Sequence, residues 1–328
     1  MTFNKSKMVS ALAMAGILTL TGCESDEAKE AVFSLGVSDA PVENAEEVNI
    51  ELDQVKLIPM NEDGSEKGEE VIVDTFTNEA GEEVDTIQVN LLDFQGTSQI
   101  KIIDETQNIQ LDAGNYEMEL VVVDAGSYVI EQGDSAQQPI KIPSSRLRLG
   151  EFEVASQYVQ VGDTPAYTLE FDLTQSLVQR GNAITNNGYI VKPHGVRIVS
   201  QYGDISGTVA GDYTNLGTCS VYVYAGDVVE YGDLFDANDD IFDAPVEEIT
   251  AAAPLATVKV ADDGSYSIGF VAPGDYQAAL YCSVVEDNNV QFDGLTIPAA
   301  GEITPDVVSF SVANQESVTV NFDAPAAQ

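Results

Sequence analysis

The strongest constraint on the fold is a series of short runs in which apolar and polar residues alternate, most of them bounded by Gly, Asp, Asn or Pro. Alternation gives a β-strand two different faces, and these turn residues end strands. Helical spacing of apolar residues is confined to short pieces such as 174–179. The runs lie at 48–58, 86–92, 100–103, 116–123, 167–173, 189–199, 205–211, 219–226, 256–260, 265–271, 276–285 and 317–322. We therefore predict an all-β fold with two β-sandwich-type domains in tandem.

The distribution of charge divides the chain. The 328 residues include 55 acidic and 13 basic residues, for a net charge of −42, and Lys259 is the only basic residue from position 204 onward. This shift predicts a β-domain over 31–203 and a more acidic β-sandwich over 204–328. Because nucleic acid is itself a polyanion, we expect no nucleic-acid partner. The charge fits solubility in a salty medium, binding of divalent cations or a basic partner.

The N-terminal segment has the layout of a secretory signal peptide. Lys5 and Lys7 precede an apolar run from Met8 to Leu20, which is shorter than the about 20 residues of a transmembrane helix. The run ends in Leu20-Thr21-Gly22-Cys23, which resembles the lipobox of bacterial lipoproteins. The resemblance implies a signal peptide over 1–22, acylation of Cys23, and a tether over 23–30 that holds the protein at a membrane. Residue 24 is Glu and not the Asp that signals retention of a lipoprotein in the inner membrane, which favours the outer membrane. The alternative is an ordinary signal peptide with a chance cysteine.

A short pattern occurs twice. LDAGNYEMEL (111–120) and VAPGDYQAAL (271–280) both place a glycine, a polar residue and a tyrosine before a strand. We expect Gly114 and Gly274 to supply a positive φ, and Tyr116 and Tyr276 to bond back to the turn. The alternative is two unrelated turns of common composition.

The first domain resembles a known family of bacterial lipoproteins. The stretches FSLGVSDAPVENAEEVNIEL (33–52), VNLLDFQG (89–96), LDAGNYEMELVV (111–122) and YIVKPHGVRIVSQYGDISGTV (189–209) resemble domain of unknown function 4382. The resemblance implies a secreted, anchored β-domain, and it brings no catalytic or binding residues, so His194 receives no role.

The second domain is similar to carboxypeptidase-regulatory-like, or transthyretin-like, β-sandwiches. The similarity rests on ISGTV (205–209), DDGSYSIGFV (262–271) and APGDY (272–276). It implies a non-catalytic spacer or binding module.

The cysteines separate into one anchor and one pair. Cys219 and Cys282 both fall on the predicted core faces of strands in the second domain. In an oxidising compartment we predict that they form a disulfide, and the alternative is two buried free thiols.

One acidic stretch has the spacing of a calcium loop. Asp236, Asn238, Asp240 and Glu247 occupy positions 1, 3, 5 and 12 of an EF-hand-like loop, although Ile241 stands where the turn needs Gly. The alternatives are a Ca²⁺ site that orders this segment and a solvated acidic insertion.

Carbohydrate binding is a second ligand hypothesis. Tyr222 and Tyr224 share the face opposite Cys219, where two rings could form a platform for a sugar. The chain has no Trp, and tyrosine is also common on half-exposed strands.

Enzymatic activity is not expected. The chain contains one His and lacks the G-x-S-x-G, H-E-x-x-H, Walker and dinucleotide-binding motifs. We expect a non-catalytic lipoprotein of the bacterial envelope with a structural or interaction role and an unidentified protein or glycan partner. The alternative is a surface module that binds glycan or calcium.

Overall fold

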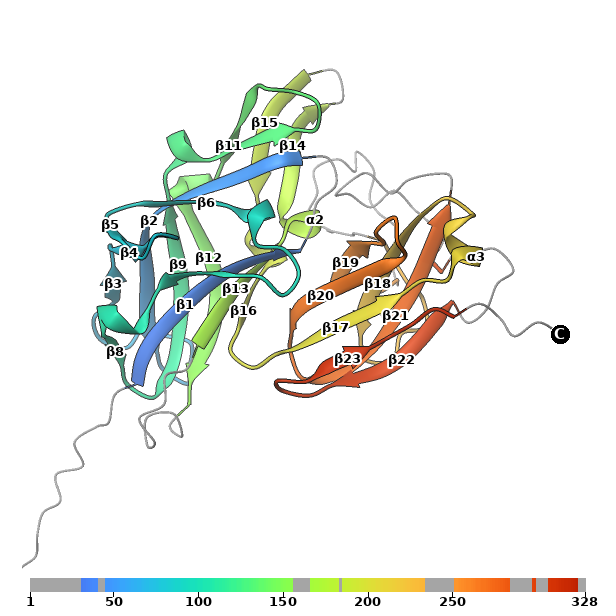
Figure 1. Cartoon of the computed structure of the whole chain (residues 1–328). Helices are drawn as coiled ribbons and strands as arrows, with labels where there is room; N and C mark the ends of the chain where they lie inside the picture. The colour runs from blue at the N-terminus through green and yellow to red at the C-terminus, as the bar shows by residue number, and fades with distance from the viewer. Residues whose placement is uncertain are drawn as a thin grey trace, which may run out of the picture.

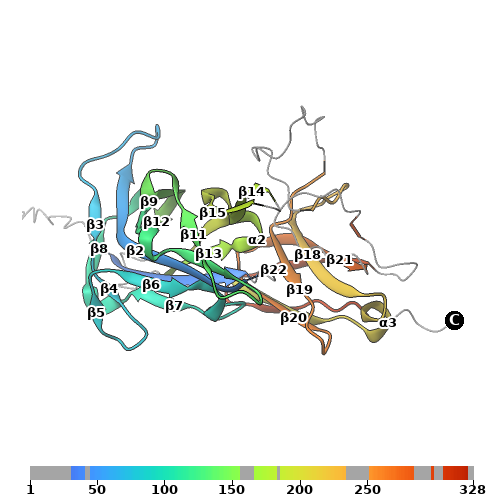
Figure 2. The ribbon, with the colours of Figure 1, turned by 90° about the horizontal axis from the view of Figure 1, so that it is seen from above.

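The computed structural model describes residues 31–40, 45–155, 166–182, 185–233, 251–283, 297–298 and 306–323. Within these residues the chain is all-β, as predicted, and the helical segments span four residues or fewer. The strands form two units that lie side by side, blue to green and yellow to red (Figures 1 and 2). No helix in this part of the chain is long and apolar enough to span a membrane.

The first unit is a sandwich of two sheets. One sheet has the strand order β16-β13-β1-β7, with β8 also paired to β1. Its strands are β1 (Ala31–Ala40), β7 (Ile100–Ile103), β8 (Ile109–Leu111), β13 (Ala166–Asp172) and β16 (Val196–Val199). At its centre β1 and β13 run parallel, and Ser38 pairs with Glu170.

The facing sheet has the order β12-β9-β2-β10-β11-β15-β14, with β3 and β6 also paired to β2. Its strands are β2 (Ala45–Met60), β3 (Val71–Val73), β6 (Ile87–Asn90), β9 (Gly114–Val122), β10 (Tyr128–Glu131), β11 (Gln137–Lys141), β12 (Arg146–Val154), β14 (Leu177–Asn182) and β15 (Thr185–Val191). A separate pair, β4 (Phe76–Thr77) and β5 (Glu83–Val84), completes the unit. One continuous apolar core joins the sheets, and in it the ring of Phe33 lies 5.4 Å from that of Tyr167 and 6.1 Å from that of Phe152.

The second unit has two smaller sheets. The strands β17 (Gly203–Thr208), β20 (Ser265–Val271) and β23 (Ser317–Thr319) form one sheet in the order β20-β17-β23. The other has the order β19-β18-β21-β22, formed by β18 (Thr218–Ala225), β19 (Ala256–Lys259), β21 (Gly274–Ser283) and β22 (Val307–Val312). A second apolar core lies between them and includes Ile205, Val221 and Leu280.

The repeated glycine–tyrosine pattern forms the same bond in both units. Tyr116 donates its hydroxyl to the carbonyl of Asp112 (3.0 Å), and Tyr276 donates to the carbonyl of Ala272 (2.6 Å). The expected bond back to the turn is therefore confirmed twice. The expected positive φ is present at Gly114 (154°) and not at Gly274, where a Cβ atom would lie 3.3 Å from the Tyr276 hydroxyl.

These bonds predict small losses of stability. We expect Tyr116→Phe and Tyr276→Phe each to lower the free energy of unfolding by about 1 kcal/mol, because each leaves a turn carbonyl without its donor. Urea unfolding of the single variants measures the loss. Tyr128→Phe is the control, since its hydroxyl makes a longer bond to Glu47 (3.3 Å); an equal loss there would argue against a special role for the turn bonds.

Candidate functional site

The most unusual polar feature lies on the outward face of the sheet formed by β16, β13, β1 and β7. Side chains alternate between the two faces of a strand, and Leu35 of β1 and Tyr167 of β13 point into the core. Every second residue of these strands, beginning next to Leu35 and Tyr167, therefore faces away from the core. Such a face ordinarily contacts water. Here each of its polar residues on β1 and β13 is 1% exposed or less: Ser34, Ser38, Thr168, Glu170 and Asp172.

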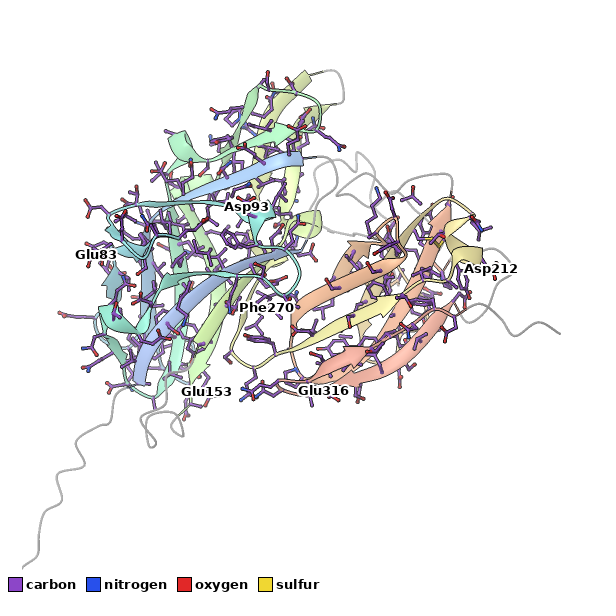
Figure 3. All side chains as sticks on the ribbon, in the orientation of Figure 1. Glu83, Asp93, Glu153, Asp212, Phe270 and Glu316 are labelled. Atoms are coloured by element: carbon purple, nitrogen blue, oxygen red, sulfur yellow. A yellow bond between two sulfur atoms is a disulfide. The ribbon has the colours of Figure 1, made fainter. Side chains whose placement is uncertain are left out.

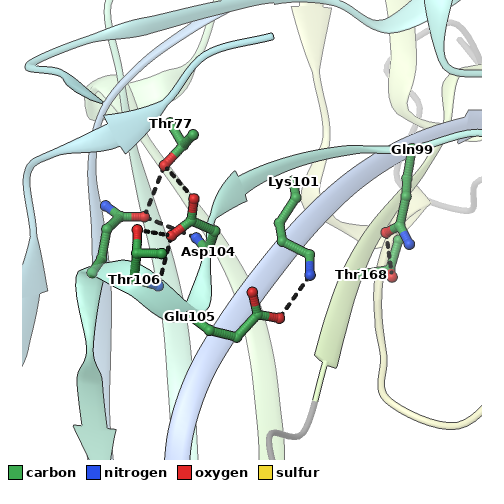
Figure 4. A network of polar contacts seen from close by, with 8 residues as sticks. Thr77, Gln99, Lys101, Asp104, Glu105, Thr106 and Thr168 are labelled. Atoms are coloured by element: carbon green, nitrogen blue, oxygen red, sulfur yellow. Dashed lines mark hydrogen bonds and ion pairs between the residues drawn. The ribbon is translucent and has the colours of Figure 1, made fainter. Parts of the chain in front are cut away.

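A loop of the first unit covers part of this face. The Ser38 hydroxyl lies 3.1 Å from the Phe94 carbonyl and 2.8 Å from the Ser98 carbonyl, and Thr168 donates to Oε1 of Gln99 (3.0 Å; Figure 4). Gly36 leaves room for this side chain, because a Cβ atom there would lie 2.1 Å from Gln99 Oε1. The loop 94–99 is therefore held to the sheet by its own polar contacts.

Beside it, a second polar network caps the beginning of a short turn. Asp104 accepts from the Thr106 amide (2.8 Å) and contacts Thr77 (3.2 Å), and Lys101 forms an ion pair with Glu105 (2.7 Å; Figure 4). The hydrogen bond from the Thr106 side chain lowers the pKa of Asp104. The carboxylate caps a single 3₁₀ turn, so we assign this network a structural role.

The second unit closes over the same loop. A Cβ atom on Gly269 would lie 2.0 Å from the Gly96 carbonyl, so the two backbones touch. Phe270 lies on the side of β20 that faces the first unit (Figure 3), and its ring is 4.6 Å from that of Tyr202 in the connection between the units. Phe270 is buried although it belongs to neither core, and its φ of 52° lies in the left-handed region.

A pocket of about 280 Å³ opens between the units. Asp172, His194 and Arg197 of the first unit form its polar wall. The second unit supplies an apolar wall made by Tyr224, Ala225, Val228, Ala252, Ala253, Pro254 and Leu255. We call the outward face of β1, β13 and β16, together with this pocket and the loop 94–99, the seam.

Carboxyl groups at the seam and just beneath it favour the neutral form. Burial raises the pKa of Glu170 to about 8, although Arg197, its cross-strand neighbour, opposes the shift. Burial also raises the pKa of Asp39, on the core face of β1, well above its usual value, and Glu170 and Asp172 add to this effect. Among the described residues, no hydrogen-bond partner reaches Nε or Nη2 of Arg197 or Oε2 of Glu170. The seam is therefore a buried polar contact with incomplete pairing.

The predicted disulfide is confirmed. Cys219 and Cys282 face each other across β18 and β21, with an S–S distance of 2.01 Å. Both side chains lie in the second core, as the alternation of their strands indicated.

The predicted tyrosine platform is wrong. Tyr222 and Tyr224 are 0% exposed, because a second apolar layer that includes Val228 and Ile297 covers their face of the sheet. The Tyr224 hydroxyl donates to the Gly232 carbonyl (2.6 Å), and its ring meets Tyr231 edge-on. Neither ring is available to stack on a sugar.

Other predicted site residues lie outside the described part of the chain. These are the anchor Cys23 and the calcium candidates Asp236, Asn238, Asp240 and Glu247. Within the described ranges, no group of three or more His, Cys, Asp or Glu side chains has the geometry to hold a metal ion.

The structure therefore defines a class of protein: two all-β units in tandem, with a cross-strand disulfide in the second unit and a buried polar seam. Residues 30–193 match the family described as "Domain of unknown function (DUF4382)". The chain therefore belongs to the DUF4382 family, which confirms the resemblance seen in the first unit. The search of curated proteins found no match.

Solved structures give remote likenesses. The Bacillus anthracis TIE protein is 13% identical, with a TM-score of 0.21; 90% of this chain aligns with 34% of that one. The minor pilin GBS52 of Streptococcus agalactiae is 12% identical (TM-score 0.21; 90% and 98% covered). The major pilin subunit of Bacillus cereus is 11% identical (TM-score 0.23; 90% and 70% covered). At these TM-scores the likenesses carry no argument about function.

Proposed function

We propose that this chain is a non-catalytic lipoprotein, anchored through Cys23 to the outer membrane of a bacterial envelope, where its β units have a structural or interaction role. The observation that carries the proposal is the distribution of the cysteines. Cys219 and Cys282 are joined to each other, which leaves Cys23, at the end of the apolar N-terminal run, as the one remaining cysteine. Disulfides persist outside the reducing cytoplasm, so the pair supports export and the unpaired cysteine supports acylation.

Membrane fractionation tests the anchor. We expect Cys23→Ser to move the protein from the membrane fraction to the soluble fraction and to remove the added mass of the acyl chains. Each buried methylene contributes about 0.8 kcal/mol of membrane binding, so loss of the acyl chains removes the main attachment. The matched control is the double variant Cys219→Ala, Cys282→Ala, which keeps the lipobox and should stay in the membrane fraction. Retention of the Cys23→Ser protein in membranes would defeat the proposal.

We also propose that the second unit, 204–328, is a separate domain of the carboxypeptidase-regulatory-like type. Its two sheets enclose an apolar core of their own, and the core of the first unit ends at Val196, before β17 begins. Its partner in the envelope would be a protein or a glycan. Covalent capture from intact cells, followed by mass spectrometry of the linked species, distinguishes the two.

A further inference from the structure

The pocket between the units has two walls of different chemistry. Its volume is about 280 Å³, and both units contribute to it. On the first unit the wall is polar and contains Arg197, on β16, and His194, in the turn before that strand. On the second unit it is made of alanine, valine and leucine side chains and Pro254, and the Tyr224 hydroxyl there already donates to a carbonyl (2.6 Å). Small-molecule sites in proteins combine an apolar lining with a few polar groups, and they lie preferentially between domains.

Arg197 is the residue of this pocket whose hydrogen bonds are incomplete. Nε and Nη2 of its guanidinium are buried and have no hydrogen-bond partner among the described residues. The ion pairs in this part of the chain do not include Arg197 either. Its cross-strand neighbour Glu170 keeps its proton at neutral pH, because burial raises the pKa of that carboxyl to about 8. Buried polar groups in native proteins are nearly always paired, so the unused donors of Arg197 indicate an acceptor that enters the pocket.

The other polar residues of the wall limit the charge of that acceptor. Asp172 is 1% exposed and has an interaction of its own, and His194 also has one. A phosphate with two negative charges would be repelled by the Asp172 carboxylate, whereas a single negative charge is balanced by the guanidinium. A carboxylate also matches the planar fork of a guanidinium. The polar wall therefore selects a ligand with one carboxylate.

The apolar wall determines the rest of the ligand. A sugar would turn hydroxyl groups toward alanine, valine and leucine side chains, where these hydroxyls would be left unpaired. An aromatic or short aliphatic body needs no such partners and is removed from water there. At about 30 Å³ for each water-sized volume, the pocket holds roughly nine of them, which is the size of one ring or short chain with a carboxylate.

We propose that this pocket binds a small organic acid, with the carboxylate on Arg197 and the apolar body against residues 252–255 of the second unit. The ligand contacts both units, so its binding stabilises the side-by-side arrangement seen in Figure 1. The site does not depend on the lipid anchor or on a protein or glycan partner.

Nuclear magnetic resonance of the one histidine tests the site. His194 lines the pocket and is the only histidine of the chain, so its imidazole gives a single reporter signal. Benzoate is titrated at about pH 7 into the mature chain, 23–328, carrying Cys23→Ala. We expect a saturable shift of the signal with benzoate and at least about tenfold weaker binding of benzamide, which has the same shape without the charge. Acetate, which lacks the apolar body, should not saturate the signal at the same concentrations.

Three variants make the result specific. Arg197→Gln should remove the preference for benzoate over benzamide. Ala253→Leu, at an exposed position of the apolar wall, fills the pocket and should weaken the binding of both ligands while the guanidinium is unchanged. Arg180→Gln is the matched control, because Arg180 lies outside the pocket on β14 and donates to the Asn187 carbonyl (3.4 Å); this variant should bind benzoate as the parent does.

Circular dichroism checks that each variant is folded. The proposal would be overturned by the absence of a saturable shift with benzoate in the parent chain, by equal saturation with acetate, or by an unchanged preference for benzoate in a folded Arg197→Gln chain. If the Arg197→Gln chain does not fold, the Ala253→Leu chain decides, because benzoate binding equal to that of the parent would place the ligand outside the pocket.

Discussion

Replacing Cys219 and Cys282 together by alanine is expected to lower the free energy of unfolding of the second unit by about 4 kcal/mol. The disulfide joins residues 63 apart and so restricts the unfolded chain, whereas the folded strands are already paired in register. Urea unfolding of the variant and its parent, both carrying Cys23→Ala, measures the difference.

Reduction of the parent protein provides the control for this prediction. Unfolding in the presence of a thiol reductant removes the same cross-link without changing the sequence, so its effect should match that of the double variant. A loss below about 1 kcal/mol in both experiments would show that the cross-link does not limit the unfolded state as the loop-entropy relation requires.

The second large effect is a dependence of stability on pH that comes from Glu170. Its pKa is about 8 in the folded protein and 4.5 in the reference state. Between these values only the unfolded chain loses the proton, so the stability that Glu170 contributes falls as the pH rises and levels off above about 8. The whole fall is about 5 kcal/mol at about 1.4 kcal/mol per pH unit.

Glu170→Gln should remove this slope because the amide does not titrate. The stability of the variant relative to the parent should therefore rise from about pH 4.5 to about pH 8, by up to about 5 kcal/mol. Chemical denaturation at a series of pH values gives the comparison. Glu119→Gln should lose the contacts to Arg146 and Arg148 and keep the slope. Parallel curves for the parent and the Glu170→Gln variant would contradict the assignment.

The sequence predicted what depends on local pattern. Alternation identified the all-β fold, and it put Cys219 and Cys282 on the face that packs into a core, which is why their pairing could be predicted. The repeated glycine–tyrosine pattern also predicted the two turn bonds. In each, the tyrosine lies two residues after the glycine, and its hydroxyl reaches back to the carbonyl four residues before the tyrosine.

Other strands lacked a clear signal. The segment Arg146–Val154 contains a register shift between Arg148 and Gly150, and Gln137–Lys141 includes a proline, so neither was among the predicted runs. The short piece at 174–179 with helical spacing forms a helix only over Leu173–Ser176, and β14 follows it directly.

The errors concern faces covered by distant parts of the chain. Alternation assigned Tyr222 and Tyr224 to the face away from the core, which is correct, but that face has an apolar cover of its own. Alternation likewise assigns Glu170 and Asp172 to the polar face of β13, but both side chains are buried because that face lies in the seam. A period of two residues distinguishes the faces of a strand and contains no information on what packs against each of them.

The parallel pairing of β17 with β23 has a mechanical consequence. These are the first and last described strands of the second unit, and they pair at Asp204 with Ser317, Ile205 with Val318 and Ser206 with Thr319. A pulling force that enters at the start of β17 and leaves at the end of β23 slides the two strands along each other. The hydrogen bonds between them are then loaded together and do not open one after another, so the second unit is built to resist tension along the chain.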